Sequence, residues 1–230
     1  MTAGLIVLCR YSSRRLPGKI LRKIAGRTVL DHILDRLRHG VPGHPVVVAT
    51  SGDPDDDPIA RHCAAAGVSC FRGPLDDVAG RFLACAEQEG WQYAVRVNGD
   101  NLFADTNTLR CLLAAAETGA YDFLTNVPGR TFPYGMSVEV LRVSFFRGVV
   151  SALEAPEDRE HVTRWLYERP EVGRRFVLEN DVCPEARGLK LALDTEEDLE
   201  RSRIMMESMT YPPHAYGLAE ITALARAAGA

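Results

Sequence analysis

Two adjoining stretches, Leu5-Ile-Val-Leu-Cys9 and Arg10-Tyr-Ser-Ser-Arg-Arg-Leu-Pro-Gly-Lys19, indicate how the chain folds. Five consecutive apolar residues are typical of a strand buried on both faces. The polar loop that follows carries four cations, two serines and a Pro-Gly turn, and we predict a helix over residues 28–38. Strand, polar loop and helix in this order predict an α/β unit that binds its ligand at the carboxyl end of the strand.

The four cations of this loop, Arg10, Arg14, Arg15 and Lys19, can surround a triphosphate. Guanidinium groups bind phosphate oxygens through paired hydrogen bonds, and a lysine adds a point charge. The alternative is a solvated basic turn. The position of the cations, directly after a buried strand and beside a Pro-Gly turn, favours the ligand-binding interpretation.

Composition limits the possible functions. The 230 residues predict a single domain over 1–230, and 46% hydrophobic against 25% charged residues provides for a full core. The formal net charge of −4 argues against a nucleic-acid partner. Basic residues concentrate within 10–38, which fits a small anion better than a polymer.

Cysteine usage and hydropathy indicate the compartment. Six cysteines are scattered without a C-x-x-C pair, which argues against a zinc ribbon, and most of them have apolar neighbours that predict buried thiols. We find no signal peptide and no apolar run of membrane-spanning length. The expectation is a cytoplasmic protein with no membrane partner.

The first half of the chain repeats the strand-loop-helix pattern. The acidic run Asp53-Pro-Asp-Asp-Asp57 is interpreted as capping of the next helix. Asp76 or Asp77 is predicted to cap another helix, and Arg72 and Arg81 beside it fit either a ligand contact or an ordinary surface position. Further strands are predicted at 45–50, 68–71, 93–97 and 121–127, and further helices at 58–66, 76–89 and 105–119.

The pattern changes after residue 127. Residues 128–140 predict a hairpin or loop excursion and not another βαβ unit. Residues 128–181 are expected to form a smaller lobe over the sheet that contributes to the acceptor site and a dimer contact. Asp194 is predicted to cap a late helix. The other elements predicted here are helices at 142–153, 158–168 and 217–228, and strands at 175–179 and 189–193.

Two carboxylates follow predicted strands and suggest a metal site. Asp100 ends Asn98-Gly-Asp100 after the strand at 93–97, and Asp194 follows the late strand. An Asn-Gly-Asp sequence alone is an ordinary turn, but an aspartate past a strand that neighbours the first one is a good ligand for a hard cation. Two carboxylates and several cations suit a nucleoside triphosphate with Mg²⁺, because the cations stabilise the charge that grows as pyrophosphate leaves.

Other nucleotide chemistries lack their motifs. The chain has no G-x-x-x-x-G-K-[ST] sequence, which excludes P-loop kinase chemistry, and no G-x-G-x-x-G after the first strand, which argues against a dinucleotide oxidoreductase. No Ser-His-Asp or Cys-His arrangement can be recognised in the sequence, and His161 is the one histidine in a strongly polar context.

These motifs together resemble a known family. The stretch from Arg10 to Lys19 closely resembles the start of CMP-3-deoxy-manno-octulosonate synthetases, and residues 193–199 are similar to a late metal-binding stretch. The middle of the chain resembles the spore-coat polysaccharide (SpsF-like) branch of cytidylyltransferases. Its matching segments are 47–50, 57–60, 71–73, 77–81, 97–100, 132–139 and 159–163, so that the similarity covers residues 4–205.

The resemblance implies an α/β, GT-A-like Rossmann-type three-layer nucleotidyltransferase fold with a mostly parallel sheet and a small inserted lobe. It implies transfer of CMP from CTP to an acidic sugar, with Mg²⁺ as cofactor, and a homodimer. Carried over residue by residue, Lys19, Asp100 and Arg15 would be catalytic, and Asp100 and Asp194 would bind the metal. The nucleotide would contact Arg10, Ser13, Arg15, Lys19, Arg72, Asp77 and Asn98, and Tyr134, Glu139, Arg159, Glu160 and His161 would face the acceptor or the dimer partner.

Several alternatives stay open. Asn101-Leu102 replaces an acidic or Cys residue followed by Pro in the family, so the acceptor can be a 2-keto sugar acid such as an octulosonate or nonulosonate, or a phosphonate. A glycosyltransferase using a nucleotide-sugar is a second hypothesis, although the sequence has one acid where such enzymes often carry Asp-x-Asp. A non-catalytic nucleotide sensor is a third, and the pair of carboxylates argues against it.

Overall fold

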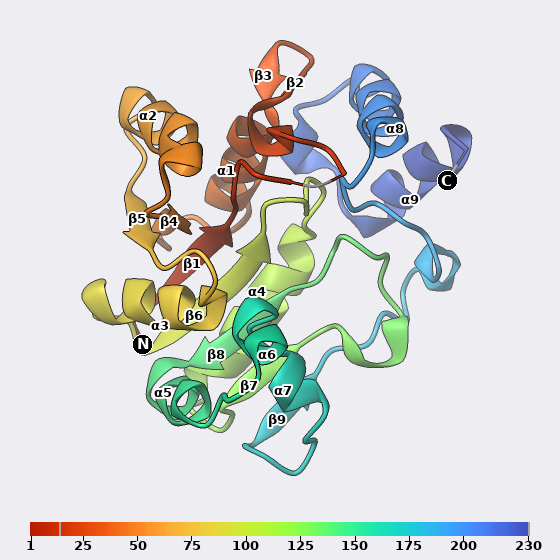
Figure 1. Ribbon diagram of the computed structural model, residues 1–230. Helices are drawn as coiled ribbons and strands as arrows, with labels where there is room; N and C mark the ends of the chain where they lie inside the picture. The colour runs from red at the N-terminus through yellow and green to blue at the C-terminus, as the bar shows by residue number, and fades with distance from the viewer. Residues whose placement is uncertain (14, 230) are drawn as a thin grey trace.

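The computed structural model describes residues 1–13 and 15–229; Arg14, one of the four loop cations, and Ala230 lie outside the described residues. A seven-stranded sheet forms the centre, in the order β5-β4-β1-β6-β8-β7-β9 (Figure 1). Only β8 runs antiparallel to its neighbours. The strands are β1 (Ala3–Leu8), β4 (Val46–Ser51), β5 (Cys70–Gly73), β6 (Tyr93–Asn98), β7 (Phe123–Thr125), β8 (Glu139–Arg142) and β9 (Arg175–Val177), and β2 (Lys23–Ile24) pairs separately with β3 (Arg27–Thr28).

Helices cover both faces of the sheet and make three layers (Figure 1). The core on one face joins the sheet to α1 (Val29–Gly40), α2 (Asp57–Ala65), α4 (Thr106–Glu117), α8 (Glu196–Glu207) and α9 (Leu218–Ala227). The core on the other face joins it to α3 (Val78–Gln88), α5 (Val143–Ser151) and α7 (Arg164–Tyr167), and α6 (Pro156–Glu160) packs beside α3. Short 3₁₀ turns are η1 (Lys19–Leu21), η2 (Pro54–Asp56), η3 (Pro128–Arg130), η4 (Pro184–Ala186) and η5 (Pro213–Ala215).

The first strand shows why the fold is layered. Leu5 and Val7 enter one core, whereas Ile6 and Leu8 enter the other, because successive side chains of a strand point to opposite faces. All four are buried, as a continuous apolar run predicts for a central parallel strand. The prediction of β1, of the following helix and of its neighbour β6 is therefore confirmed.

Most other predicted elements are found with small shifts at their ends, but three predictions in the second half are wrong. The helix expected at 158–168 is broken into α6 and α7, with Val162 between them at a φ of 49° that a helix does not contain. Residues 189–193 form no strand; their contact is a single bridge between Lys190 and Tyr134. Asp194 does not cap α8, because Thr195 does, in a reciprocal capping box with Asp198.

The segment 128–181, for which a smaller lobe is expected, contributes two strands to the central sheet. Strand β8 lies between β6 and β7, and β9 forms one edge. The long loop after β7 leads into β8, which pairs antiparallel with β7. The hairpin predicted here therefore forms within the main sheet. Helices α5, α6 and α7 lie on the face that α3 covers, whereas Phe132, Met136 and Val138 enter the core on the other face.

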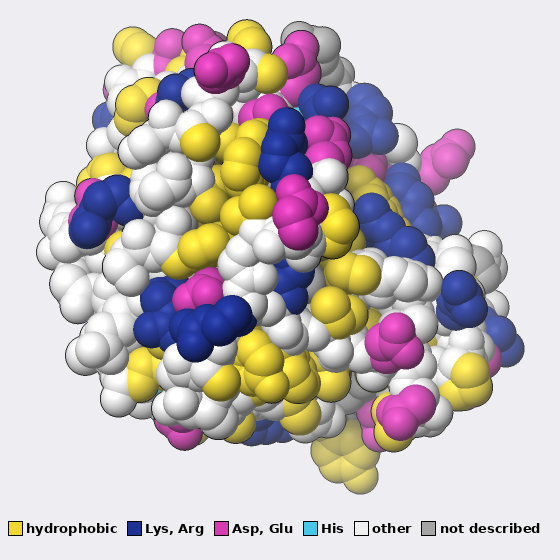
Figure 2. All heavy atoms as spheres, turned by 90° about the horizontal axis from the view of Figure 1, so that it is seen from below, with side chains coloured by type: hydrophobic (Ala, Val, Ile, Leu, Met, Phe, Trp, Pro, Cys, Tyr) yellow, Lys and Arg dark blue, Asp and Glu magenta, His cyan; other side chains and the backbone are white. Residues whose placement is uncertain are grey.

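The surface carries charges of both signs. On the face seen in Figure 2, basic and acidic side chains lie next to one another in small groups, and apolar and uncharged surface separates these groups. Neither sign of charge covers the face. Within residues 1–13 and 15–229, no helix combines the length and the apolar character needed to cross a membrane.

Candidate active site

A cavity of about 490 Å³ opens at the carboxyl ends of β1 and β6, where parallel α/β sheets bind their ligands. Its lining comes from the loop after β1, the loop after β6, α3, α6 and the segment before α8. Ten of the residues predicted for the site line it: Arg10, Ser13, Arg15, Lys19, Asn98, Asp100, Tyr134, Glu160, His161 and Asp194.

Lys19 lies at the centre of this cavity. Its Nζ contacts Oδ2 of Asp100 at 3.3 Å and Oδ1 of Asp194 at 3.5 Å, and donates a hydrogen bond to the Leu193 carbonyl at 2.7 Å. A terminal nitrogen of Arg15 lies 2.9 Å from the same Oδ1 of Asp194. The structure thus brings together two carboxylates that are 94 positions apart in the numbering; these four side chains are called the Lys19 cluster below.

Local backbone geometry places Lys19 there. Gly18 has a φ of 65°, a conformation that side chains disfavour, and a Cβ on it would lie 2.9 Å from the ring of Tyr11. Gly99 allows the loop after β6 to approach the loop after β1, because a Cβ there would lie 2.6 Å from that of Cys9. The Pro-Gly turn and the glycine of Asn98-Gly-Asp100 are therefore what let the strand ends meet.

Asp194 is held in place from the side of α8. The Asp198 carboxylate accepts hydrogen bonds from the backbone amides of Asp194 and Thr195, both at 3.0 Å, and from Lys190 at 2.6 Å. Burial raises the pKa of Asp198, but these hydrogen bonds outweigh it and hold that pKa below its ordinary value. The ionised Asp198 therefore fixes the backbone that presents Asp194 to the cavity.

The donor set fits a divalent cation. Mg²⁺ takes oxygen ligands, keeps several waters and uses one or two protein carboxylates together with substrate phosphates. Asp100 and Asp194 face one point of the cavity, and the ammonium of Lys19 shows that a cation there contacts both. The side chain of Asp100 is 27% exposed and that of Asp194 only 6%, so a ligand reaches this pair from the side of Asp100.

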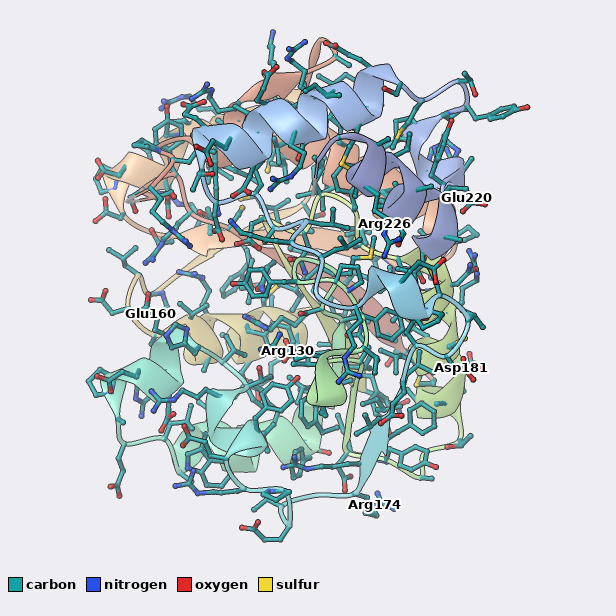
Figure 3. All side chains as sticks on the ribbon, turned by 90° about the vertical axis from the view of Figure 1, so that its right-hand side faces the viewer. Arg130, Glu160, Arg174, Asp181, Glu220 and Arg226 are labelled. Atoms are coloured by element: carbon teal, nitrogen blue, oxygen red, sulfur yellow. The ribbon has the colours of Figure 1, made fainter. Side chains whose placement is uncertain are left out.

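The opposite wall of the cavity comes from α6 and its neighbours. Arg10 contacts Glu160 at 3.2 Å across the opening, and both side chains are about half exposed. Figure 3 shows Glu160 at the end of α6, on the other side of the molecule from Asp181 and from Arg226 of α9. Tyr134 is half exposed as well, so this wall is free to contact a second substrate.

Four further residues predicted for the site make other contacts and do not line this cavity. Arg72 donates hydrogen bonds to the Ser51 and Asp53 carbonyls and pairs with Asp57 at 2.7 Å, so it holds the loop after β4. Asp77 caps α3 through the Gly80 amide and pairs with Arg159 at 3.0 Å. Arg72, Asp77, Arg159 and Glu139 do not line the cavity.

Glu139 is buried in a group of its own, called the Glu139 cluster below. It lies opposite Arg96 in the pairing of β8 with β6, and the two side chains form an ion pair. Its other oxygen accepts hydrogen bonds from the hydroxyls of Thr163 and Tyr167, both at 2.6 Å. Burial and the adjacent Glu139 charge raise the pKa of Tyr167 far above its ordinary value, so its hydroxyl stays a donor.

Two further arginines line the cavity: Arg96, which the sequence analysis did not name, and Arg81, which it left open between a ligand contact and a surface position. Arg96 lines it, and Nε of Arg96 is buried without a partner. Arg81 lines it too; its Nε is likewise unpartnered, and burial lowers the pKa of its guanidinium. Arg96 carried a signal, because it interrupts an otherwise apolar strand, whereas Arg81 on α3 could not be distinguished from a surface arginine.

The chain is similar to known proteins over most of its length. The family model for cytidylyltransferases matches residues 5–215. The spore coat polysaccharide biosynthesis protein SpsF of Bacillus subtilis is 30% identical over 229 residues, which cover 96% of this chain and 93% of SpsF.

Two solved structures extend the comparison. A cytidylyltransferase from Leptospira borgpetersenii superposes with a TM-score of 0.90 at 28% identity, over 99% of this chain and 94% of that one. A CMP:2-keto-3-deoxy-manno-octonic acid synthetase complexed with CTP superposes with a TM-score of 0.69 at 20% identity, over 90% of this chain and 99% of the synthetase. The second likeness shows the fold alone.

Proposed function

Since the chain belongs to the cytidylyltransferase family, we propose that it transfers CMP from CTP to the hydroxyl of a 2-keto sugar acid and releases pyrophosphate. The observation that carries this proposal is the Lys19 cluster on the cavity floor. Cations and carboxylates that neutralise one another there can exchange partners when a polyphosphate and a divalent cation arrive.

Three cations of the loop after β1 are proposed to bind the triphosphate. Arg10, Arg15 and Lys19 all line the cavity, and Arg15 is 65% exposed, so its guanidinium is free to turn toward an anion. Ser13 and Asn98 add uncharged groups to the same lining. Preorganised cations of this kind stabilise negative charge that develops on a leaving group.

Mg²⁺ is proposed as the cofactor, and Asp100 and Asp194 would hold it. When bound, the ion would neutralise phosphate charge and help to orient the triphosphate. Asp198 would keep Asp194 oriented through the amide hydrogen bonds described above.

In the proposed reaction the hydroxyl oxygen of the acceptor forms a bond to the α-phosphorus of CTP, and the bond from that phosphorus to the bridging oxygen of pyrophosphate breaks. The hydroxyl proton leaves to solvent. Such in-line displacement depends mainly on positioning and on charge stabilisation. The chain supplies both through Lys19 and Arg15, while Tyr134, Glu160 and His161 face the acceptor.

Pyrophosphate release tests this proposal. The purified chain is incubated with CTP, Mg²⁺ and a panel of 2-keto sugar acids, with phosphonates as a second panel. We expect release with a sugar acid and a loss of about 10²–10³-fold in Asp100→Asn, as for removal of one electrostatic group from an active site. Asp181→Asn, at an exposed position across the molecule, is the matched control and keeps its activity.

The two panels separate the possible acceptors. Release with phosphonates alone would replace the sugar acid by a phosphonate, and release with neither panel would contradict the proposed acceptor classes. An unaffected rate in Asp100→Asn would remove Asp100 from the metal site. The homodimer and the absence of a nucleic-acid partner stay predictions, and sedimentation of the purified chain checks the first.

A further inference from the structure

A second cluster of ligand-type side chains lies outside the cavity. Asp35 and His39 occupy successive turns of α1, and His214 comes from η5, near the C-terminus. One carboxylate oxygen and one imidazole nitrogen from each histidine all lie within 4.8 Å of one another. None of the three lines the candidate active site, and together they are called the Asp35 cluster.

The cluster is built on a rigid support. The side chain of Arg36, next to Asp35, is buried and donates hydrogen bonds to the carbonyls of Pro213 and Tyr216, which flank His214 on both sides. A third bond from Arg36 reaches the Ala104 carbonyl. The position of His214 relative to α1 is therefore fixed by contacts that do not involve the imidazole, which is the preorganisation that a ligand site needs.

The carboxylate of the cluster lies within reach of both imidazoles. Oδ2 of Asp35 lies 3.2 Å from Nδ1 of His214, and Oδ1 lies 3.6 Å from Nδ1 of His39. Arg27 is 3.6 Å from Oδ1, so Oδ2 is the oxygen that a cation can reach with less competition.

We propose that Asp35, His39 and His214 form a binding site for a borderline transition-metal cation of the Zn²⁺ type. Two imidazoles and one carboxylate are a recurrent protein ligand set for Zn²⁺, which takes nitrogen and oxygen ligands at about 2.0–2.2 Å and completes its shell with water. Mg²⁺ and Ca²⁺ prefer oxygen ligands, so this site selects against the cation proposed for the active site.

Binding requires one local adjustment. The two imidazole rings now stack, with centroids 3.9 Å apart and 4° between their planes, and Nδ1 of His39 lies 2.8 Å from the Asp35 carbonyl. Nitrogen lone pairs lie in the ring plane, so parallel rings cannot both point at one ion until one of them turns. The side chain of His39 is 53% exposed and has the freedom to turn, whereas His214 is 26% exposed.

An ion at this point joins two parts of the chain that are far apart in sequence. It would link α1, which packs against η1, to η5 and through it to α9. A cation that binds the folded chain and not the unfolded one stabilises the folded state. The proposed role is therefore a clamp that holds the C-terminal segment against α1, independent of the transfer reaction.

Calorimetric titration with Zn²⁺ in excess Mg²⁺ tests the site, using the full chain in the Asp100→Asn background so that the pair of active-site carboxylates is broken. We expect one Zn²⁺ per chain, and a rise in Tm of about 5 °C or more at a hundredfold excess over Kd. His39→Ala and His214→Ala should each weaken binding at least about tenfold. His62→Ala is the matched control, because His62 pairs with Asp31 at 2.8 Å without a second imidazole.

The outcomes are distinct. Zn²⁺ binding that survives both His39→Ala and His214→Ala, or that is lost equally in His62→Ala, would overturn the proposal, as would the absence of a Tm rise in the folded parent chain. Pyrophosphate release with Mg²⁺ alone is measured separately with Asp100 intact. It should be unchanged in His39→Ala and His214→Ala, so failure of the zinc site is distinguishable from failure of the proposed transfer reaction.

Discussion

The Lys19 cluster and the Glu139 cluster are built from the same kinds of group, yet they differ in what holds each charge. In the Lys19 cluster the ammonium is shared between two carboxylates, and one of them, Asp194, also pairs with the exposed Arg15. In the Glu139 cluster the carboxylate has a guanidinium on one oxygen and two hydroxyls on the other. The first arrangement can exchange partners with a ligand, whereas in the second the Glu139 carboxylate is already satisfied and serves as scaffold.

Replacing Lys19 by Met should give the largest effect. Removal of this cation from the cavity floor is expected to lower turnover about 10²–10³-fold. It should also leave Asp100 and Asp194 facing each other without their shared partner, so added Mg²⁺ should raise the Tm of the variant more than that of the parent. Thermal unfolding with and without Mg²⁺, together with pyrophosphate release, measures both effects.

The exposed Lys23 provides the control for this variant, because Lys23→Met removes a lysine four positions away that does not line the cavity. If Lys19→Met keeps full turnover, or if Mg²⁺ stabilises it no more than the parent, the Lys19 cluster is an ordinary ion pair. The Lys19 cluster would then have a structural role, as the Glu139 cluster has.

Replacing Glu139 by Gln should act mainly on stability. The change leaves the Arg96 guanidinium largely buried with no counter-charge, and breaking a buried pair on one side costs about 3 kcal/mol or more. For a chain of this length that corresponds to a fall in Tm of roughly 6–12 °C. Chemical denaturation of both proteins checks the value.

Glu196→Gln is the matched control, since Glu196 pairs with Arg22 at 2.8 Å with both side chains exposed. An exposed pair contributes less than about 1 kcal/mol. Equal losses of stability in the two variants would show that Glu139 is not buried as the structure has it. The interpretation of the Glu139 cluster as a buried structural ion pair would then be wrong.

Replacing Asp198 by Asn should have an intermediate effect that depends on pH. Asp198 has a lowered pKa in the folded chain, so its contribution to stability is complete above about pH 5 and fades as the pH falls through its unfolded pKa and toward the folded one. At pH 7 the loss of charged hydrogen bonds at the α8 cap should cost about 1–2 kcal/mol. Urea unfolding at several pH values from 7 to 3 measures the difference.

The sign of the pH effect is the test. The parent should lose more stability than Asp198→Asn between pH 5 and pH 3, because only the parent has this carboxylate to protonate. If the difference in unfolding free energy between the two proteins stays constant over that range, the ionised Asp198 carboxylate does not hold Asp194 in place.

The elements that could be predicted are those specified by local sequence. Strand β1 and helix α1 follow from an apolar run and from a Thr28 cap, and their positions do not depend on distant residues. The break between α6 and α7 could not be predicted, because Thr163 is drawn to Glu139 by a contact across 24 positions. The segment 189–193 failed for the same reason, since what it meets is the backbone of Tyr134 and not a strand partner.

The candidate site shows the same division. Lys19 and Asp100 could be placed together because the loops that carry them follow β1 and β6, and strand ends converge at one edge of a parallel sheet. The prediction for Asp194 depended on a strand at 189–193 that does not form; the Leu193 amide instead donates to the Asp100 carbonyl and holds this segment beside the loop after β6. The partner of Glu139 could not be predicted, because it depends on the register that pairs β8 with β6. Burial of the Arg81 guanidinium likewise depends on how α3 packs, which the sequence does not state.

Replacing Arg159 by Ala should give the smallest effect and marks the edge of the site. Family resemblance places Arg159 at the acceptor, whereas the structure pairs it with the helix cap Asp77 and with the Leu153 carbonyl. Because Arg159 is partly exposed and lies outside the cavity, its loss should change the unfolding equilibrium constant by no more than about twofold to threefold. The KM of the acceptor should change by no more than about the same factor. Steady-state kinetics with the acceptor found by the panel measures it.

A tenfold rise in the acceptor KM of Arg159→Ala would move the boundary of the site. Asp77→Asn then separates two explanations, because this change weakens the ion pair with Arg159 while an amide oxygen still accepts from the Gly80 amide. If both variants raise KM, the pair acts together and orients α6, which carries Glu160 on the cavity wall. If only Arg159→Ala does, the guanidinium reaches the acceptor itself, and the pair with Asp77 is exchangeable in the way the Lys19 cluster is.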